Sequence, residues 1–474
     1  MLDSLTDIGA LTSAVVRREI SVEEIATGTL ARLDAADREI RAFTAVNHAA
    51  VMSDARTIDR RIARQESVGQ LVGVPLGVKD LFDVVNFPTS YGSEAVPSYL
   101  PNRDATAVAR LRGAGALVIG KTRTAELAWS TDTPPTKNPT DSALICGGSS
   151  GGSAAAVGAG FVHAALGTDT GGSIRIPAAL CGVVGIKPTY GLVGRGGILP
   201  ANWSLDTAGP IARTVADVRL ILQELVGHDD RDPSSALANL AGGVRERLRA
   251  GGTTSLRGLR LGIVEEALFE IVDNEARATH ESLLESLANE GVELITLAFP
   301  EAALVPAALL AIDLPEGAAI HSELLKANGA LITDAIRALL HVAHIIPGVI
   351  VARAHQARRE VVARIRELFE ANALDALIAP GNPAPAIRSD DLEHSYVRMS
   401  GERELALWAY ARVCWLANLT GQPALVLPTV STAPPLGVQL IGRPFRDDVL
   451  LGIAAAVEEI LPIERSVLTE KEHA

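Results

Sequence analysis

The hydrophobic and polar positions of the chain follow a helical period at its start and a strand-like pattern immediately afterwards. In residues 1–65, Ser21 and Glu24 have the spacing of a capping box, and aliphatic residues follow at helical intervals. Residues 70–85 (QLVGVPLGVKDLFDVV) are short apolar segments separated by Gly and Pro, which is typical of extended chain. The pattern therefore predicts an N-terminal helical region followed by strands.

Helical and strand-like segments then alternate along the rest of the chain. Asp104 is predicted to cap a helix that ends near Gly113, and the apolar run ALVIG at 116–120 is predicted to be a buried strand. Further strands are predicted at 256–266, 291–299, 375–380, 423–429 and 437–442, and further helices at 275–290, within 301–372 and at 447–460. Alternation of this kind indicates an α/β fold.

The chain offers little sign of a division into separate domains. The stretch 229–236 (DDRDPSSA) is the best candidate for a flexible connection, but it is short. We therefore predict a single domain over residues 1–474, with an inserted helical region.

Composition and charge narrow the classes of function. Apolar residues make up 48% and charged residues 21% of the chain, as in an ordinary globular protein. The net charge of −13 repels phosphate backbones, which argues against nucleic acid as a partner. Three widely spaced cysteines suit a reducing compartment, and the acidic N-terminus is unlike a signal peptide. The most apolar stretch, 144–166, is too rich in Gly and Ser to span a membrane. We expect a cytoplasmic protein without a membrane partner.

Lys79 lies inside an apolar run, VGVPLGVKD at 72–80. Such a lysine either extends its amine to water from the end of a strand, or is buried and loses its proton because burial disfavours the charged form. Lowering a lysine pKa from about 10.4 to about 7.5 costs roughly 4 kcal/mol, so a lysine buried in this way is kept for a chemical purpose. A neutral Lys79 amine could act as a base.

A Gly/Ser-rich segment, GGSSGGS at 147–153, supplies candidate serines. It could be a flexible loop or an anion-binding turn, but it matches neither the P-loop nor the dinucleotide-binding pattern. Its start also matches G-x-S-x-G, the nucleophile elbow of α/β-hydrolases, which would make Ser149 or Ser150 the nucleophile. That alternative requires a downstream acid and histidine, for which Asp375 and His394 are candidates without a recognisable setting.

A second glycine-rich segment, GTDTGGSIRIP, carries a further serine. Thr170, Gly171 and Gly172 precede Ser173, and the helix-forming PAAL follows. Glycines allow several N–H groups to approach one point, as in an oxyanion hole, and a helix N-terminus favours a serine alkoxide. Considered alone, the segment could equally be a turn in which Ser173 caps a helix.

The histidines do not indicate a metal site. His341 and His344 lie three positions apart on a predicted helix, with His355 further on, and no acidic or cysteine partner can be placed beside them. We therefore predict that the protein binds no metal.

Together these segments resemble the amidase signature family. The resemblance rests on VGVPLGVKD at 72–80, GGSSGGSAAAVGAG at 147–160, GTDTGGSIRIPAALCGVVGIKPTYG at 167–191, SLDTAGPIARTVAD at 204–217, NLTGQPALVLPT at 418–429 and PLGVQLIG at 435–442. It runs from about residue 5 to 465, and the two central serines stand 24 positions apart, as in the family. It implies a central mixed β-sheet flanked by helices on both faces, with a signature core at 66–230 and a helix-rich region at 300–400 that shapes the substrate pocket.

The resemblance implies an amide hydrolase that needs no cofactor. Ser173 is then the nucleophile, Lys79 is the base, and Ser149, which in the family follows a cis peptide bond, carries the proton between them. The N–H groups from Thr170 to Ser173 would form the oxyanion hole. The chemistry is consistent with these roles, because a serine hydroxyl is a weak nucleophile until an adjacent base activates it.

Three further residues match positions with supporting roles in the family. Asp169 and Arg175 are expected to brace the loop around the nucleophile. Trp129, in AELAWSTD, lies where related enzymes contact the acyl group, and it could line the pocket or belong to the core.

The resemblance leaves the substrate open among small aliphatic, aryl, urea-like and fatty amides. It also leaves open the role of the glutamine-hydrolysing component of a tRNA-dependent amidotransferase, although residues 122–132 (TRTAELAWSTD) lack the sequence typical of that component. A non-catalytic scaffold is a third alternative, disfavoured because all three catalytic positions are filled. The expected partners are a small-molecule amide and, for self-association, a second copy of the chain in a dimer.

Overall fold

A single mixed β-sheet runs through the protein. The structure, a computed structural model, describes residues 7–252, 254–264, 272–391, 396–399, 402–429 and 434–461. Eleven strands form the sheet in the order β1-β3-β2-β4-β6-β5-β12-β13-β9-β7-β8. Their bounds are β1 Phe43–Val46, β2 Pro75–Lys79, β3 Leu117–Thr122, β4 Ala164–Asp169, β5 Val184–Lys187, β6 Thr207–Ala212, β7 Arg260–Val264, β8 Glu293–Leu297, β9 Ala376–Pro380, β12 Ala424–Pro428 and β13 Gly437–Ile441. A separate hairpin consists of β10 Tyr396–Met399 and β11 Glu402–Leu405.

This sheet contains both parallel and antiparallel pairs, which confirms the predicted mixed α/β architecture. β2 lies between β3 and β4 and is parallel to both, and β7 is parallel to β8 and β9. The remaining neighbours are antiparallel. One sheet thus takes strands from Phe43 to Ile441. The division of the chain into a signature core and a pocket-shaping region stays a prediction.

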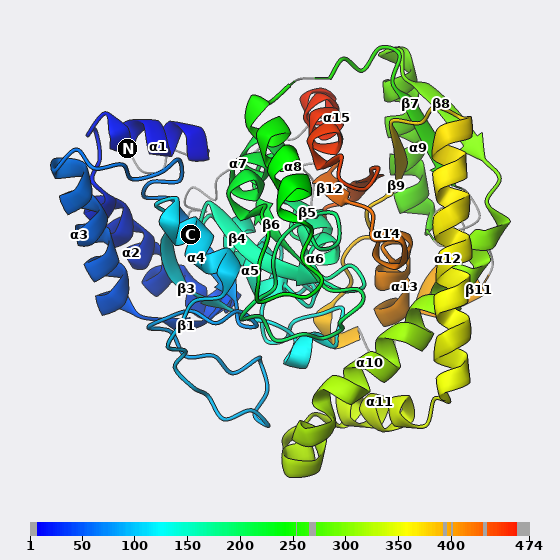
Figure 1. Cartoon of the computed structure of the whole chain (residues 1–474), viewed down its shortest axis with the longest axis horizontal. Coiled ribbons are helices and arrows are strands. Elements are labelled where there is room, and N and C mark those ends of the chain that lie inside the picture. The colour runs from blue at the N-terminus through cyan, green and yellow to red at the C-terminus, as the bar shows by residue number, and fades with distance from the viewer. Residues whose placement is uncertain are drawn as a thin grey trace.

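Helices pack along the sheet and extend beyond it at both ends. Their bounds are α1 Ile8–Val16, α2 Val22–Ile40, α3 His48–Ala63, α4 Thr106–Gly113, α5 Gly151–Gly158, α6 Arg175–Leu180, α7 Val215–Leu225, α8 Ala238–Ala250, α9 Asn274–Asn289, α10 Val305–Asn328, α11 Asp334–His344, α12 Gly348–Ala371, α13 Ala406–Arg412, α14 Trp415–Thr420 and α15 Asp447–Ile460. Figure 1 shows α1–α3 at one end of the molecule and α10–α12 at the other. The two glycine-rich segments lie between these two helical groups, around α5 and α6.

Two predictions about the N-terminal half meet different outcomes. The capping box at α2 is confirmed, since the Ser21 side chain accepts from the Glu24 N–H and the Glu24 carboxylate accepts from the Ser21 N–H. The prediction that Asp104 caps a helix is wrong, because α4 begins after Ala105 and has no side-chain cap. The Asp104 carboxylate instead accepts from the Val85 N–H at 2.7 Å, so it holds the preceding loop.

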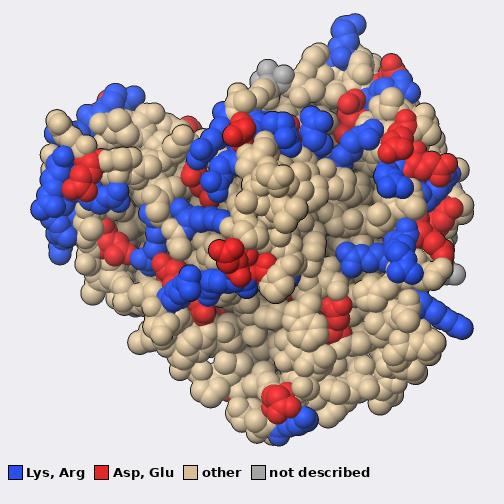
Figure 2. Space-filling model, in the orientation of Figure 1, with Lys and Arg blue, Asp and Glu red and all other residues tan. Residues whose placement is uncertain are grey.

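The helix α10, in the helical group farthest from α1–α3, is unusually apolar. Residues 300–331, which include α10, are long and apolar enough to cross a membrane by length and composition alone. The face over α10 and α11 shows few charges (Figure 2). Leu331, Val342 and Ile345, in or next to these helices, are exposed. α10 nevertheless packs against α11, α12 and α14 and contributes buried residues to the second hydrophobic cluster. The absence of a membrane partner therefore stays a prediction.

Candidate active site

The sheet brings the lysine and the two glycine-rich segments to one edge. Lys79 is the last residue of β2, and the segment that carries Ser173 follows β4 directly. Because β2 and β4 are adjacent and parallel, their carboxyl ends meet at the same edge, where sites of α/β proteins form. Ser149 lies just before α5, which packs against both strands.

The Lys79 amine is fully buried among hydroxyl groups. Nζ donates to Ser149 Oγ at 2.8 Å, to Ser150 Oγ at 2.9 Å and to Thr168 Oγ1 at 2.8 Å. Burial lowers the pKa of Lys79 to about 7, although nearby Asp206 and Asp169 act in the opposite direction. A large share of the molecules therefore carries a neutral amine near neutral pH, in contact with Ser149.

The segment around Ser149 is held tightly by its main chain. The Gly148–Ser149 peptide bond is cis, as the family resemblance implies. A Cβ atom at Gly148 would lie 2.6 Å from the Asp132 carbonyl oxygen, so only glycine fits there. The Ser149 carbonyl oxygen accepts from the Ala125 N–H at 3.1 Å.

The loop after β4 places Ser173 at the mouth of a pocket. Gly172 has a φ of +118°, and a Cβ atom there would lie 2.8 Å from Cys414 Cβ. The Ser173 carbonyl oxygen accepts from the Ser150 N–H at 3.1 Å, which joins the two glycine-rich segments. The structure thus brings the three predicted catalytic residues to one region, where a side-chain hydrogen bond links Lys79 to Ser149.

One predicted oxyanion donor is already occupied. The Gly172 N–H donates to Asp169 Oδ1 at 2.9 Å, so it cannot also serve a reacting carbonyl. The N–H groups of Thr170, Gly171 and Ser173 remain the candidates.

A buried ion pair braces this loop, at the positions where the resemblance places one. Arg175 Nε donates to Asp169 Oδ2 at 3.0 Å and Arg175 Nη2 to Asp169 Oδ1 at 2.9 Å, with both side chains fully buried. Burial opposes ionisation of Asp169, but Arg175 and the amide of Asn418 outweigh it and hold the pKa below its usual range. The guanidinium also donates to the Cys414 carbonyl oxygen and to Gln439 Oε1.

Ser173 opens into an apolar cavity of about 120 Å³. Trp129 lines the wall of this cavity, which is one of the two positions predicted for it. Trp408, Trp415 and Leu309 line the wall as well. Three of the four Trp residues of the chain thus line one cavity, and no pattern along the sequence indicates that they converge. Asp313, on α10, lines the same cavity and had no sequence signal.

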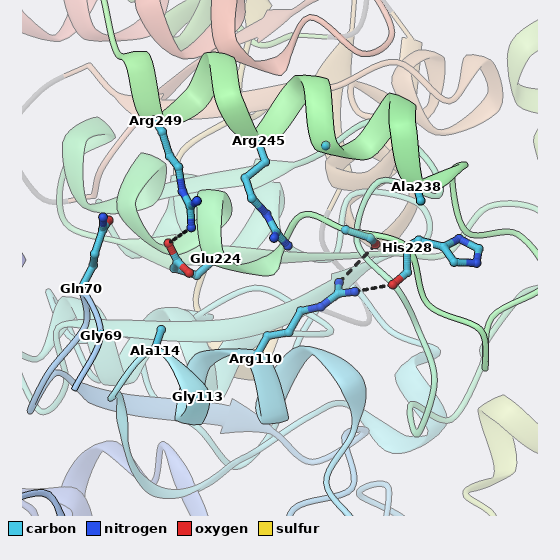
Figure 3. Close-up of a pocket in the computed structure, with 12 residues that line it drawn as sticks. Gly69, Gln70, Arg110, Gly113, Ala114, Glu224, His228, Ala238, Arg245 and Arg249 are labelled. Atoms are coloured by element: carbon cyan, nitrogen blue, oxygen red, sulfur yellow. Dashed lines mark hydrogen bonds and ion pairs between the residues drawn. The ribbon is translucent and has the colours of Figure 1, made fainter. Parts of the chain in front are cut away.

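A larger and more open pocket lies away from the predicted catalytic residues. It has a volume of about 580 Å³ and lies where α4, α7 and α8 meet (Figure 3). Its arginines are engaged: Arg110 donates to the carbonyl oxygens of Gly227 and His228, and Arg249 pairs with Glu224 at 3.1 Å. These contacts join the C-terminal end of α7 to α4 and α8. The pocket has a basic lining because the arginines that make these contacts lie in its wall.

The alternatives raised by the sequence gain no support from the geometry. Among the residues that the structure describes, no three of His, Cys, Asp and Glu are grouped to hold a metal ion. For the elbow hypothesis, Asp375 Oδ2 accepts from the Arg260 N–H at 2.9 Å beside β9. His394 lies outside the described residues.

Comparisons with known proteins agree with the resemblance. The family model described as Amidase matches residues 24–451. A protein of Pseudomonas putida named amidase is 36% identical, over 93% of both chains. The A subunit of the glutamyl-tRNA(Gln) amidotransferase of Chloroflexus aggregans is 35% identical, over 96% of both. The structure of a peptide amidase from Stenotrophomonas maltophilia superposes with a TM-score of 0.80 at 28% identity, covering 97% of this chain and 98% of that one. The chain therefore belongs to the amidase signature family and is an amide-hydrolysing enzyme.

Proposed function

We propose that this chain cleaves the C–N bond of a carboxylic amide through an acyl-enzyme on Ser173, with Ser149 and neutral Lys79 as the proton relay. The observation that carries the proposal is the fully buried Lys79 amine, 2.8 Å from Ser149 Oγ, with a pKa lowered to about 7. A base must lack a proton at the working pH, and burial supplies this condition.

In the first step the Ser173 hydroxyl attacks the amide carbonyl carbon. Its proton passes to Ser149 as the Ser149 proton passes to Lys79 Nζ, so the relay ends with a protonated lysine. The carbonyl oxygen becomes an oxyanion, and each N–H that binds it contributes about 3–4 kcal/mol to the transition state. Thr170, Gly171 and Ser173 supply the available N–H groups.

In the second step the tetrahedral intermediate collapses. The C–N bond breaks, and the proton on Lys79 returns through Ser149 to the leaving nitrogen, which departs as ammonia or an amine. The same relay then deprotonates water, which attacks the ester, releases the carboxylic acid and restores the Ser173 hydroxyl.

The cavity favours a small acyl group of apolar or aromatic character. Its volume of about 120 Å³ and its indole and leucine walls leave little room for a long chain. Small aliphatic and aryl amides are therefore preferred to fatty amides.

Adduct formation tests the mechanism directly. A fluorophosphonate should label the peptide that contains Ser173, and Ser173→Ala should abolish both labelling and ammonia release from a panel of amides. Ser149→Ala should slow labelling strongly, and Ser150→Ala should slow it less. An adduct on Ser149 or Ser150, with Ser173→Ala still turning over, would overturn the mechanism.

A second candidate function is glutamine hydrolysis for a tRNA-dependent amidotransferase. It is favoured by the 35% identity to the Chloroflexus aggregans protein over almost the whole chain. Ammonia release from glutamine by the purified chain, compared with release from the amide panel, separates the two candidates. Location in the cytoplasm and assembly as a homodimer stay predictions.

A further inference from the structure

One oxygen of the Asp313 carboxyl group, which lines the substrate cavity, lacks a hydrogen-bond donor. It lies on α10 and lines the cavity together with Ser173. Its Oδ1 is buried and has no hydrogen-bond partner within the described part of the chain. A buried carboxyl oxygen without a donor costs free energy, so a ligand that brings a donor to it is favoured.

The electrostatic surroundings of Asp313 favour a cation. Among the described residues, the charged groups that act on it are Asp206 and Glu316, both acidic. Each of these has its own donors: Asp206 accepts from Thr170 Oγ1 at 2.6 Å, and Glu316 accepts from the Ser204 N–H at 2.9 Å. The Oδ1 atom of Asp313 is thus the oxygen of this acidic group that remains available to a ligand.

Aromatic rings surround the same space. Trp129, Trp408 and Trp415 line the cavity, and indole faces attract cations. Trp129 is held against α10, because a Cβ atom at Gly317 would lie only 1.9 Å from its Cζ2. Gly317 is one helical turn beyond Asp313, so the indole and the carboxyl group occupy one face of α10.

We propose that Asp313 and the surrounding indoles form a subsite for a protonated amine on the acyl part of the substrate. The proposal rests on the proposed function and narrows its substrate class to amino-substituted carboxamides. Burial, with Asp206 and Glu316 adding to it, raises the pKa of Asp313 to about 8, whereas the Asn202 side chain lowers it. An arriving ammonium group stabilises the carboxylate and displaces the proton from it.

Matched substrates test this subsite. We would compare amides that carry a terminal ammonium group, from glycinamide to 5-aminopentanamide, with alkyl amides of the same length and with the corresponding hydroxy amides. For at least one length, the wild type should prefer the ammonium compound to the alkyl compound in kcat/KM. Asp313→Asn should reduce that preference by about 10- to 100-fold, the usual effect of a hydrogen bond to a charged group.

A control variant separates the subsite from the overall charge. Glu323 is an exposed carboxylate on the same helix, paired with Lys326 at the surface. Glu323→Gln removes one negative charge and should leave the preference unchanged. The alkyl amide brings no group for Asp313, so the ratio of kcat/KM for the ammonium and alkyl compounds corrects for any general loss of activity in Asp313→Asn.

Binding separates failure of the subsite from failure of the catalytic proposal. Calorimetry with Ser173→Ala and Ser173→Ala/Asp313→Asn measures the affinity for the same compounds without turnover. Tighter binding of the ammonium compound that is lost in the double variant supports the subsite even if no amide is cleaved. Equal affinity for ammonium and alkyl compounds, or an equal preference for the hydroxy amide, would overturn the inference while leaving the hydrolytic mechanism intact.

Discussion

Replacement of Lys79 by methionine should change how the stability of the protein depends on pH. Methionine has a similar length and cannot bind a proton, so the variant removes the titration while keeping most of the volume. The pKa of Lys79 falls from 10.5, the ordinary value for a lysine in the unfolded chain, to about 7 in the folded protein. Between these values the unfolded chain holds a proton that the native chain lacks.

The sign and size of the effect follow from this difference. The free energy of unfolding of the wild type should rise by about 1.4 kcal/mol per pH unit above pH 7 because of this one group. Burial of the amine costs about 5 kcal/mol below pH 7, and this cost vanishes as the pH approaches 10.5. The free energy of unfolding of Lys79→Met, relative to that of the wild type, should therefore be highest at low pH and should decrease as the pH rises.

Urea unfolding followed by Trp fluorescence, from pH 6 to pH 9.5, measures this slope. The lost hydrogen bonds to Ser149, Ser150 and Thr168 lower the stability of the variant equally at each pH, so they do not affect the comparison. Lys326→Met, at an exposed lysine of α10, is the control and should run parallel to the wild type. If the Lys79→Met and wild-type curves are parallel, Lys79 is not neutral in the fold and cannot be the base.

Four other perturbations have defined outcomes. Lys79→Arg should abolish amide hydrolysis, because arginine keeps its proton, and near-normal ammonia release would remove Lys79 from the role of base. Arg175→Met leaves the buried Asp169 carboxylate without its charge partner and should lower the free energy of unfolding by about 3–5 kcal/mol in urea; a loss under about 1 kcal/mol would contradict the brace. Gly317→Ala places a methyl group 1.9 Å from Trp129 Cζ2, so the indole must move; KM for apolar amides should rise with a smaller change in kcat, and unchanged KM would show that the indole does not position the acyl group. Chelation with EDTA should leave hydrolysis unchanged, whereas loss followed by recovery with zinc would reveal a metal requirement.

The segments that we propose to be catalytic could be found from the sequence because each is a run of consecutive residues. Lys79 ends a short apolar strand, and the glycines that permit close packing around Ser149 and Ser173 stand within a few positions of these serines along the chain. Such constraints leave a pattern in consecutive residues. The strand β1, by contrast, is hidden within an otherwise helical region, since its partner β3 lies more than 70 residues further on.

The substrate cavity could not be assembled from the sequence, because its residues come from distant segments. Trp129, Asp313 and Trp408 reach the same cavity from a loop, from α10 and from α13. Asp313 follows an apolar run on its helix and has no motif around it. The occupied N–H of Gly172 likewise depends on where the Asp169 carboxylate points, which a run of glycines does not reveal.

The contacts of Arg175 link the active-site loop to the order in which the chain is synthesised. Its guanidinium binds the Cys414 carbonyl oxygen, the Asn418 side chain and the Gln439 side chain, all of which lie far beyond the catalytic segments. A nascent chain that has emerged only as far as α12 therefore holds Lys79, Ser149 and Ser173 without the contacts that fix the loop. Termination before Cys414 would then yield an inert fragment, and hydrolytic competence would arise only after the segment that contains Gln439 has emerged.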